Sequence, residues 1–199
     1  MKTAPSICED ILAESGLWPV VGIDEAGRGP LAGPVVACAL ILPAGLIIEG
    51  VNDSKKVTAL RREKLSAVIK EAAVAYSFGI VTPEEIDRIN ILQATMKAMT
   101  QAVSGLETMP KVALVDGTKP PPCPCPVIFM AKGDSASHLI AAASILAKVK
   151  RDAIMDELHA TYPLYGFNAH KGYGTVAHRD ALRLYGLCPQ HRRSFCGKL

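Results

Sequence analysis

The sequence predicts an α/β domain in which a mixed β-sheet is flanked by helices. Short apolar runs rich in β-branched residues, such as those at 20–23 and 34–42, have the length and composition of buried strands. The glycine-rich turn between these two runs is too short for a helical crossover, so the strands are expected to pair antiparallel. After these two strands, helix-start signals alternate with further strand-like runs. The expected order is a helix, a strand, a second helix, two strands and a final helix.

The first half of the chain is predicted to contribute three strands and two helices. Gly16 ends the first helix, and Thr58 is a plausible cap for the second. A polar loop, Asn52-Asp53-Ser54-Lys55-Lys56, precedes that second helix. In order, the expected segments are a short helix over 6–17, strands over 20–23 and 34–42, a helix from 58 to about 73, and a strand over 74–81.

The middle of the chain begins with the run Thr82-Pro83-Glu84-Glu85, which combines three helix-start signals. Asn90 is expected to begin a further helix. A buried strand over 112–115 follows and ends at Asp116-Gly117. The proline-rich run at 119–126 indicates an extended connector to a short strand over 127–130.

The run Lys132-Gly133-Asp134-Ser135 is expected to open the longest helix, which covers roughly 137–161. An apolar stripe runs along it, and Lys148 and Arg151 are expected to lie away from that stripe. Tyr162-Pro163 ends the helix, and a glycine-rich loop follows. A last helix is expected from Thr175 to Gly186.

Composition and charge narrow the class of protein. Hydrophobic residues make up 49% and charged residues 21% of the 199 residues, which is typical of a globular protein and excludes a fibrous or disordered chain. No apolar run reaches the roughly 20 residues that span a bilayer. Acidic residues soon after the start are unlike a signal peptide. We therefore expect a cytoplasmic monomer, one domain over 1–199, with no membrane partner.

Two further features of the composition are less informative. The six cysteines lack the spacing of a zinc site, and buried or unreactive thiols explain them better than a disulfide framework. From Lys171 onwards six Lys or Arg residues accompany one acid, Asp180, although the net charge is only +3. Such a basic tail could contact a polyanion, or it could be a solvated face.

Four carboxylates are predicted at the ends of strands or at a helix start: Asp24, Glu25, Asp116 and Asp134. An all-oxygen set without matching His or Cys suits a hard divalent cation such as Mg²⁺ or Mn²⁺. Two such ions about 3.5–4 Å apart could clamp the oxygens of a phosphoryl displacement. Ordinary alternatives remain at this point, because the first pair could be an acidic turn tip bridged to Arg28, and Asp134 could be a helix N-cap.

Five motifs, in chain order, resemble those of type 2 ribonuclease H, the ribonuclease HII family, over about residues 20–195. They are Gly22-Ile23-Asp24-Glu25-Ala26-Gly27-Arg28-Gly29-Pro30, Asn52-Asp53-Ser54-Lys55-Lys56, Val115-Asp116-Gly117, Lys132-Gly133-Asp134 and Gly172-Tyr173-Gly174-Thr175. The resemblance implies a ribonuclease H-like fold with a small helical C-terminal region, about 175–199, that binds substrate.

The resemblance also implies an activity, which is endonucleolytic cleavage of RNA in RNA–DNA hybrids and of single ribonucleotides embedded in duplex DNA. It makes the four carboxylates the catalytic metal ligands. It makes Gly27-Arg28-Gly29 and Tyr173 the reader of the ribose 2′-hydroxyl, the group that distinguishes RNA from DNA. Glycines at 27 and 29 would let the backbone approach a sugar where a Cβ would collide.

Several polar and basic side chains are candidate substrate contacts, although each could equally be a solvated group. They are Ser54, Lys55, Lys56, Lys148, Arg192 and Arg193.

Other functions fit the sequence less well. The spacing Gly27-x-Gly29-x-x-x-Gly33 departs from a dinucleotide-binding loop and leads into a strand where that loop needs a helix. A non-catalytic hybrid-binding module would have no use for four carboxylates, which repel phosphates unless metal is bound. A nuclease specific for DNA would have no use for a sugar-reading turn.

Overall fold

The structure, a computed structural model, describes residues 3–119 and 121–197 and leaves the side chain of Lys56 undescribed. Within those residues, five strands form one mixed sheet in the order β3-β2-β1-β4-β5. The strands are β1 (Val20–Ala26), β2 (Val35–Ile41), β3 (Ala75–Val81), β4 (Val112–Asp116) and β5 (Val127–Met130). The mixed sheet flanked by helices confirms the predicted fold class.

Pairing within the sheet follows the connections. Strand β1 pairs antiparallel with β2, as the short turn between them predicts, and β2 pairs antiparallel with β3. Strand β4 runs parallel to β1 on its other side, with Ile23 opposite Val115, and β5 runs parallel to β4. Strand β1 continues to Ala26, three residues past the predicted run, because Asp24 and Glu25 still pair with β2.

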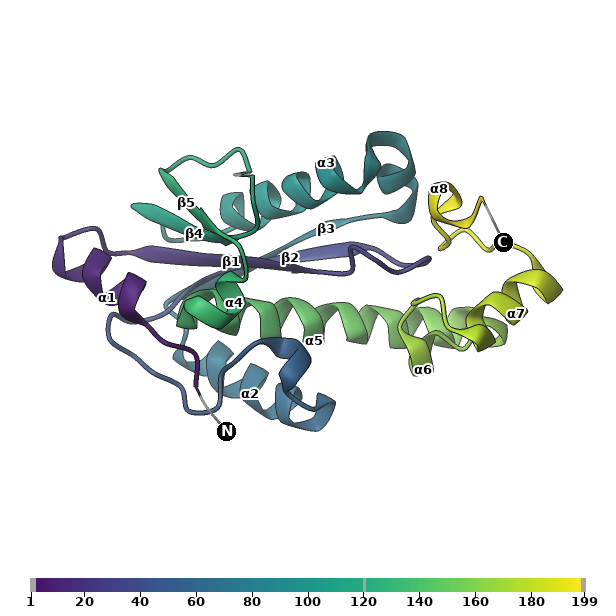
Figure 1. Cartoon of the computed structure of the whole chain (residues 1–199), viewed down its shortest axis with the longest axis horizontal. Coiled ribbons are helices and arrows are strands. Elements are labelled where there is room, and N and C mark those ends of the chain that lie inside the picture. The colour runs from purple at the N-terminus through teal and green to yellow at the C-terminus, as the bar shows by residue number, and fades with distance from the viewer. Residues whose placement is uncertain (1–2, 120, 198–199) are drawn as a thin grey trace.

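Helices cover both faces of the sheet, with α3 on one face and α5 and α2 on the other (Figure 1). Two glycines allow close approach. A Cβ at Gly22 of β1 would lie 2.5 Å from a backbone carbon of Leu139, and one at Gly79 of β3 would lie 1.9 Å from the carbonyl oxygen of Ala98. The described helices are α1 (Ile7–Glu14), η1 (Ser54–Lys56), α2 (Ala59–Ala72), α3 (Pro83–Ser104), α4 (Gly133–Ala136), α5 (His138–Thr161), η2 (Pro163–Tyr165), α6 (Phe167–His170), α7 (Val176–Tyr185) and α8 (Arg193–Cys196).

Helix α3 contains the predicted restart at Asn90, whose φ of 67° interrupts the helix. The Asn90 side chain accepts hydrogen bonds from the backbone N–H groups of Leu92 and Gln93 at 3.0 and 3.1 Å. Asparagine tolerates this left-handed conformation and caps the following turn, so the sequence signal had a local physical basis.

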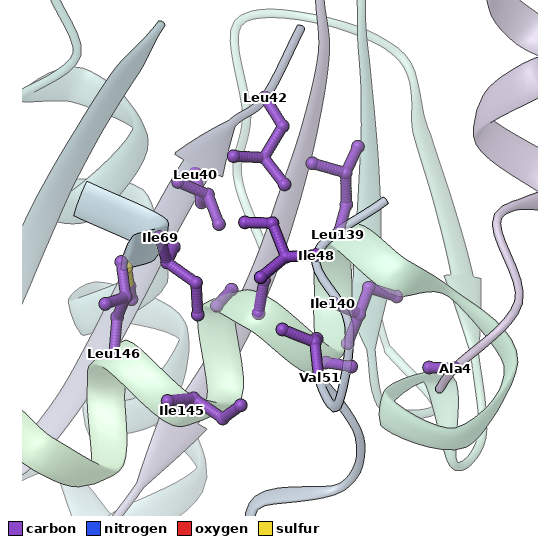
Figure 2. Close-up of a cluster of buried hydrophobic side chains, with 14 of the residues drawn as sticks. Ala4, Leu40, Leu42, Ile48, Val51, Ile69, Leu139, Ile140, Ile145 and Leu146 are labelled. Carbon is purple, nitrogen blue, oxygen red and sulfur yellow. The ribbon is translucent and has the colours of Figure 1, made fainter. Parts of the chain in front are cut away.

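The core lies in two layers because strand residues alternate between the faces. Strand β2 is buried along its whole length. Cys38 and Leu40 face α5 and α2, whereas Ala37 and Ala39 face α3. Figure 2 shows the first of these layers, formed by side chains from β2, α2 and α5. The sheet is thereby held rigidly between helices.

Helix α5 connects the sheet to the C-terminal region. The sequence predicted one helix opening near 132–135, but the chain forms the single turn α4, breaks at Ser137 and then begins α5. Residues 138–147 are buried beneath the sheet. The far end of α5 extends past the sheet and carries α6 and α7 (Figure 1). A small third core there contains Ala32, Met155, Phe167 and Leu182.

The C-terminal region is also anchored to the turn that follows β1. Ala32 forms an isolated antiparallel bridge with His191, and the Leu31 N–H donates to the Gly172 carbonyl at 2.8 Å. Helix α7 begins at the predicted cap Thr175, and Gly186 ends it as predicted. Across the described residues, every helix is too short or too polar to cross a bilayer.

Candidate active site

Four carboxylates surround one hollow at the end of the sheet where β1 and β4 finish. Asp24 and Glu25 belong to β1, Asp116 is the last residue of β4, and Asp134 is the second residue of α4. Because β1 and β4 run parallel in register, Asp24 and Asp116 lie on neighbouring strands at the same level. All four line a hollow of about 360 Å³. The structure therefore brings together the four carboxylates that the sequence singled out.

Two backbone N–H groups hold these carboxylates in place. The Glu25 N–H donates to Asp24 Oδ1, and the Gly133 N–H donates to Asp116 Oδ1, both at 2.7 Å. A Cβ at Gly133 would lie 2.7 Å from Ile140 Cδ1 and 2.9 Å from Met130 Cγ, so a larger residue there would require these side chains to shift. Helix α4 thus connects the positions of Asp116 and Asp134.

The cluster is electrostatically strained. Burial raises the pKa of Asp24 well above its usual range, and repulsion from Glu25, Asp116 and Asp134 adds to the shift. Burial also raises the pKa of Glu25, although the Arg28 guanidinium partly opposes the change. The pKa of Asp134 is raised by burial and then by neighbouring carboxylates. The side chains around the hollow leave much of the negative charge uncompensated.

The ordinary alternatives explain only part of this arrangement. Arg28 Nη1 does lie 3.3 Å from Glu25 Oε1, but half of the Arg28 side chain is exposed, and the pairing leaves the other three carboxylates without it. The alternative that Asp134 is a helix N-cap is wrong, because Lys132 occupies the N-cap position of α4 and Ser137 that of α5.

The donor set fits a hard divalent cation. It contains only carboxylate oxygens, and the buried Glu25 Oε2 has no hydrogen-bond partner among the described residues. Within the same residues, no three His, Cys, Asp or Glu side chains are already gathered closely enough to hold an ion. Asp24, Glu25, Asp116 and Asp134 would hold the cation after side-chain rotation, which brings like charges together only when a cation compensates them.

The turn Gly27-Arg28-Gly29 forms another wall of the same hollow. Gly27 has a φ of +98°, and a Cβ there would lie 2.1 Å from Arg151 Nε. This glycine therefore has a structural reason that the sequence did not indicate, since it accommodates Arg151 behind the turn, and the approach to a sugar stays a prediction. Gly29 faces the hollow, and a Cβ there would meet Tyr173 Cε1 at 3.9 Å.

Tyr173 also lines the hollow, with 46% of its surface exposed. Its backbone is fixed on both sides, since the Tyr173 N–H donates to the His170 carbonyl and the Tyr173 carbonyl lies 2.9 Å from His178 Nδ1. The Lys148 ammonium lies 5.9 Å from the centre of the tyrosine ring. An exposed ring on a fixed backbone can stack on a flat ligand with little loss of entropy.

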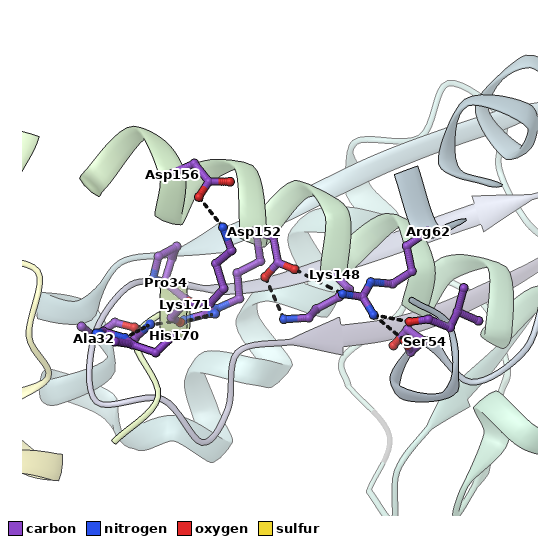
Figure 3. A network of polar contacts seen from close by, with 12 residues as sticks. Ala32, Pro34, Ser54, Arg62, Lys148, Asp152, Asp156, His170 and Lys171 are labelled. Carbon is purple, nitrogen blue, oxygen red and sulfur yellow. Dashed lines mark hydrogen bonds and ion pairs between the residues drawn. The ribbon is translucent and has the colours of Figure 1, made fainter. Parts of the chain in front are cut away.

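The predicted basic contacts divide into two groups. Ser54, Lys55 and Lys148 line the hollow. Lys148 Nζ donates to Asp152 Oδ1 at 2.7 Å, and Arg62 contacts the same carboxylate and donates to the Ser54 carbonyl at 2.9 Å (Figure 3). These contacts fix both Lys148 and Ser54 at the rim. The side chain of Lys56 lies outside the described part of the chain.

Arg192 does not contact phosphates as the sequence suggested, because its side chain is fully buried and bonds backbone carbonyls. The neighbouring Arg193 is exposed, and its backbone N–H donates to Asp87 at 2.8 Å. Of these two arginines, only Arg193 is still predicted to contact a phosphate. Arg151 was expected to lie away from the apolar stripe of its helix, and this too is wrong, since it is fully buried.

Three residues of this region were not indicated by any sequence pattern: Arg151, His178 and His191. Their partners are backbone carbonyls and each other, at sequence separations of up to 119 residues. A positively charged residue on the buried side of a helix would have been the one signal for such a role. Using that signal requires knowing which side of the helix is buried.

Comparison with known families gives one consistent result. The model of the family described as Ribonuclease HII matches residues 21–198. The chain is 54% identical over 174 residues to Ribonuclease HII 1 of Methylibium petroleiphilum, covering 87% of this chain and 88% of that one. It is 56% identical over 176 residues to Ribonuclease HII of Delftia acidovorans, covering 88% and 75% of the two chains.

Solved structures agree. The ribonuclease H2 of Pyrococcus horikoshii superposes with a TM-score of 0.74 at 30% identity, covering 88% of this chain and 92% of that one. The RNase HII of Archaeoglobus fulgidus, solved as a complex with PCNA, gives 0.73 at 27% identity over 87% and 93%.

Proposed function

Because the chain belongs to the ribonuclease HII family, and is therefore a ribonuclease H, we propose a specific cut site for it. It incises duplex DNA 5′ of a single embedded ribonucleotide, besides cutting the RNA strand of RNA–DNA hybrids. Water adds to the phosphorus and the bond to the 3′-oxygen breaks, which leaves a 3′-hydroxyl and a 5′-phosphate.

One observation supports this proposal above others: the four carboxylates, the glycine-arginine-glycine turn and Tyr173 line the same hollow. A group that reads the sugar must lie within one nucleotide of the group that cuts the phosphodiester. A nuclease specific for DNA, or a module that only binds hybrids, has no need of this combination.

The carboxylates are proposed to hold Mg²⁺ or Mn²⁺. When bound, two such ions would polarise the scissile phosphate and stabilise its attacking and leaving oxygens. Asp24 and Asp116 supply oxygens from neighbouring strands, Asp134 from α4, and Glu25 the buried oxygen that lacks a partner. The sheet fixes the backbone of β1 and β4, so binding of the cations needs rotation of side chains and little movement of the backbone.

Reading of the sugar is assigned to the turn and to Tyr173. The backbone of Gly27-Arg28-Gly29 holds the 2′-hydroxyl, because at Gly29 no side chain separates the backbone from the hollow. The Tyr173 ring stacks on the deoxyribose of the next nucleotide. Together the two readers require a ribose followed by a deoxyribose, which sets the cut 5′ of a lone ribonucleotide.

The basic side chains at the rim hold the phosphate backbone. Lys55 and Lys148 line the hollow, and the fixed position of Lys148 between Asp152 and Tyr173 keeps one positive charge beside the strand. Contacts of this kind orient a nucleic acid without reading its sequence.

The test uses three labelled duplexes of one sequence: all DNA, DNA with one ribonucleotide, and an RNA–DNA hybrid. In Mg²⁺ or Mn²⁺ we expect one cut 5′ of the ribonucleotide, cuts throughout the RNA strand of the hybrid and none in the all-DNA duplex. A chelator should abolish all cutting. Cleavage of the all-DNA duplex, a cut at another position or full activity in the chelator would overturn the proposal.

A further inference from the structure

Two buried guanidinium groups lie directly behind the sugar-reading turn. Arg151 of α5 donates to the carbonyls of Pro34, Ala32 and Lys171 at 2.9–3.0 Å. Arg192, from the C-terminal segment, donates through Nε and Nη2 to the Gly33 carbonyl at 3.0 and 2.8 Å. Arg192 also donates through Nη2 to the Gly27 carbonyl at 2.6 Å and through Nη1 to the Arg28 carbonyl at 3.0 Å. The turn after β1 is therefore held by side chains from two distant parts of the chain.

This arrangement is costly. Both side chains are fully buried, and within the described residues neither guanidinium forms an ion pair with a carboxylate. Burial lowers the pKa of Arg151 to about 10; for Arg192, burial and then repulsion from Arg151 lower it to about 9. Apolar side chains of similar volume would fill the same space at lower cost. The hydrogen bonds to the turn are what these residues add beyond packing.

The bonded carbonyls fix the direction of the neighbouring N–H groups. In a planar trans peptide, the carbonyl of one residue points opposite to the N–H of the next. Because the Gly27 and Arg28 carbonyls point towards Arg192, the N–H groups of Arg28 and Gly29 point away from it. Among the described residues no acceptor takes either of these two N–H groups. A guanidinium bonded to the carbonyl also polarises the peptide, which strengthens the N–H as a donor.

The same segment fixes Tyr173. His191, next to Arg192, lies with Nε2 at 3.1 Å from Nε2 of His178, whose Nδ1 lies 2.9 Å from the Tyr173 carbonyl. The Cys188 N–H donates to His191 Nδ1 at 3.0 Å, so the His191 proton is on Nε2 and the His178 proton on Nδ1. Adjacent residues thus hold the turn and the tyrosine.

We propose that Arg192 is a positioning residue for ribose recognition, which aims the N–H groups of Arg28 and Gly29 into the hollow for the 2′-hydroxyl oxygen, and that Arg151 supports this arrangement by holding the following residues Ala32 and Pro34. This inference rests on the proposed function and goes beyond it. Neither arginine contacts the nucleic acid, and the preference for a ribose depends on the planar, forked shape of each guanidinium in addition to its charge.

The test is the ratio of two dissociation constants in a chelator, where cleavage does not interfere. One duplex is all DNA, and the other carries a single ribonucleotide in the same sequence. One hydrogen bond to the 2′-hydroxyl predicts about tenfold tighter binding of the second duplex by the unaltered protein. In Arg192→Lys the ratio should fall towards one, because an ammonium keeps the charge but cannot bond three carbonyls in one plane.

Arg151→Lys is the second variant, and it should reduce the ratio by a smaller factor because Arg151 holds Ala32 and Pro34 beside the turn and does not bond the Gly27 and Arg28 carbonyls. Leu182→Ala is the matched control, since it removes a buried side chain from the same small core away from the turn. It should lower the melting temperature yet keep the ratio.

Two outcomes count against the inference. A full ratio in a folded arginine variant would show that the turn keeps its donors without the guanidinium fork, and would overturn it. A ratio near one in the unaltered protein would overturn the proposed reading of the 2′-hydroxyl itself, and the inference with it.

Discussion

The carboxylate cluster and the glycine-arginine-glycine turn line one hollow, yet they are built in opposite ways. The cluster concentrates like charges at the ends of β1 and β4 and is short of compensating cations. The turn carries one cation, Arg28, which pairs with Glu25, and two buried guanidinium groups that lack carboxylate partners stand behind it. The carboxylate cluster is thus suited to bind an added cation, whereas the positive charges behind the turn belong to the protein itself.

This difference separates chemistry from recognition. Under the proposed function, the surroundings of the carboxylates change when metal and substrate bind, so their strain belongs to the resting state. The turn must not change, because a hydrogen-bond donor discriminates only when it is already aimed. Substitutions in the two regions should therefore fail in different ways.

The largest effect is expected from the chemical side. Asp24→Asn removes one charge from the cluster, and the loss of several kcal/mol of transition-state stabilisation should lower cleavage at least about a thousandfold. Binding of the single-ribonucleotide duplex should persist or tighten, because less negative charge opposes the phosphates. Rates in Mg²⁺ or Mn²⁺ and dissociation constants in a chelator measure the two quantities. Turnover of Asp24→Asn near that of the unaltered protein would remove this residue from the chemistry.

A smaller effect concerns stability without metal. The folded-state pKa of Asp24 is raised above its unfolded value of 3.8, so the folded state holds the proton more tightly. Stability on this account is highest below pH 3.8 and declines as the pH rises towards the folded pKa. In a chelator at neutral pH, the free energy of unfolding of Asp24→Asn should therefore be about 1 kcal/mol or more higher than that of the unaltered protein. The free energy of unfolding of the variant should also depend less steeply on pH.

Asp180→Asn is the matched control for this measurement, because Asp180 is an exposed carboxylate on α7. Its stability should change by less than about 0.5 kcal/mol. Mg²⁺ or Mn²⁺ should stabilise the unaltered protein more than Asp24→Asn, since the cation binds the cluster only when it is intact. If Asp24→Asn were no more stable than the parent in the chelator, the cluster would not be strained in the way described.

The sequence was informative where the physical signals are local. Strand composition, the short turn and the cap at Asn90 depend on neighbouring residues, and the structure bears each of them out. The carboxylates could be found because each follows directly from an apolar strand run or precedes a helix. The break between α4 and α5 was missed, since Ser137 and His138 carry no strong helix-breaking signal.

The second wall of the hollow depends on distant contacts, and the sequence could not reveal it. Arg192 was predicted to be a phosphate contact or a solvated charge because it belongs to a basic tail, and Arg151 was predicted to lie away from the apolar stripe of its helix. Arg192 instead bonds the Gly27 and Arg28 carbonyls, and Arg151 bonds those of Ala32 and Pro34, all more than 100 residues earlier. A pattern of residue types does not encode such partners.

The separation of reading from chemistry is tested most directly by Tyr173→Ala on two substrates. Loss of a stacking contact, worth about 1–3 kcal/mol, should lower kcat/KM on the single-ribonucleotide duplex by roughly tenfold or more. The loss should be clearly smaller on a long RNA–DNA hybrid, where many registers can be cut. Tyr76→Ala, which removes a tyrosine of similar exposure on β3, should affect neither substrate. Equal losses on the two substrates, with the circular dichroism spectrum unchanged, would contradict the account and return Tyr173 to general catalysis or packing.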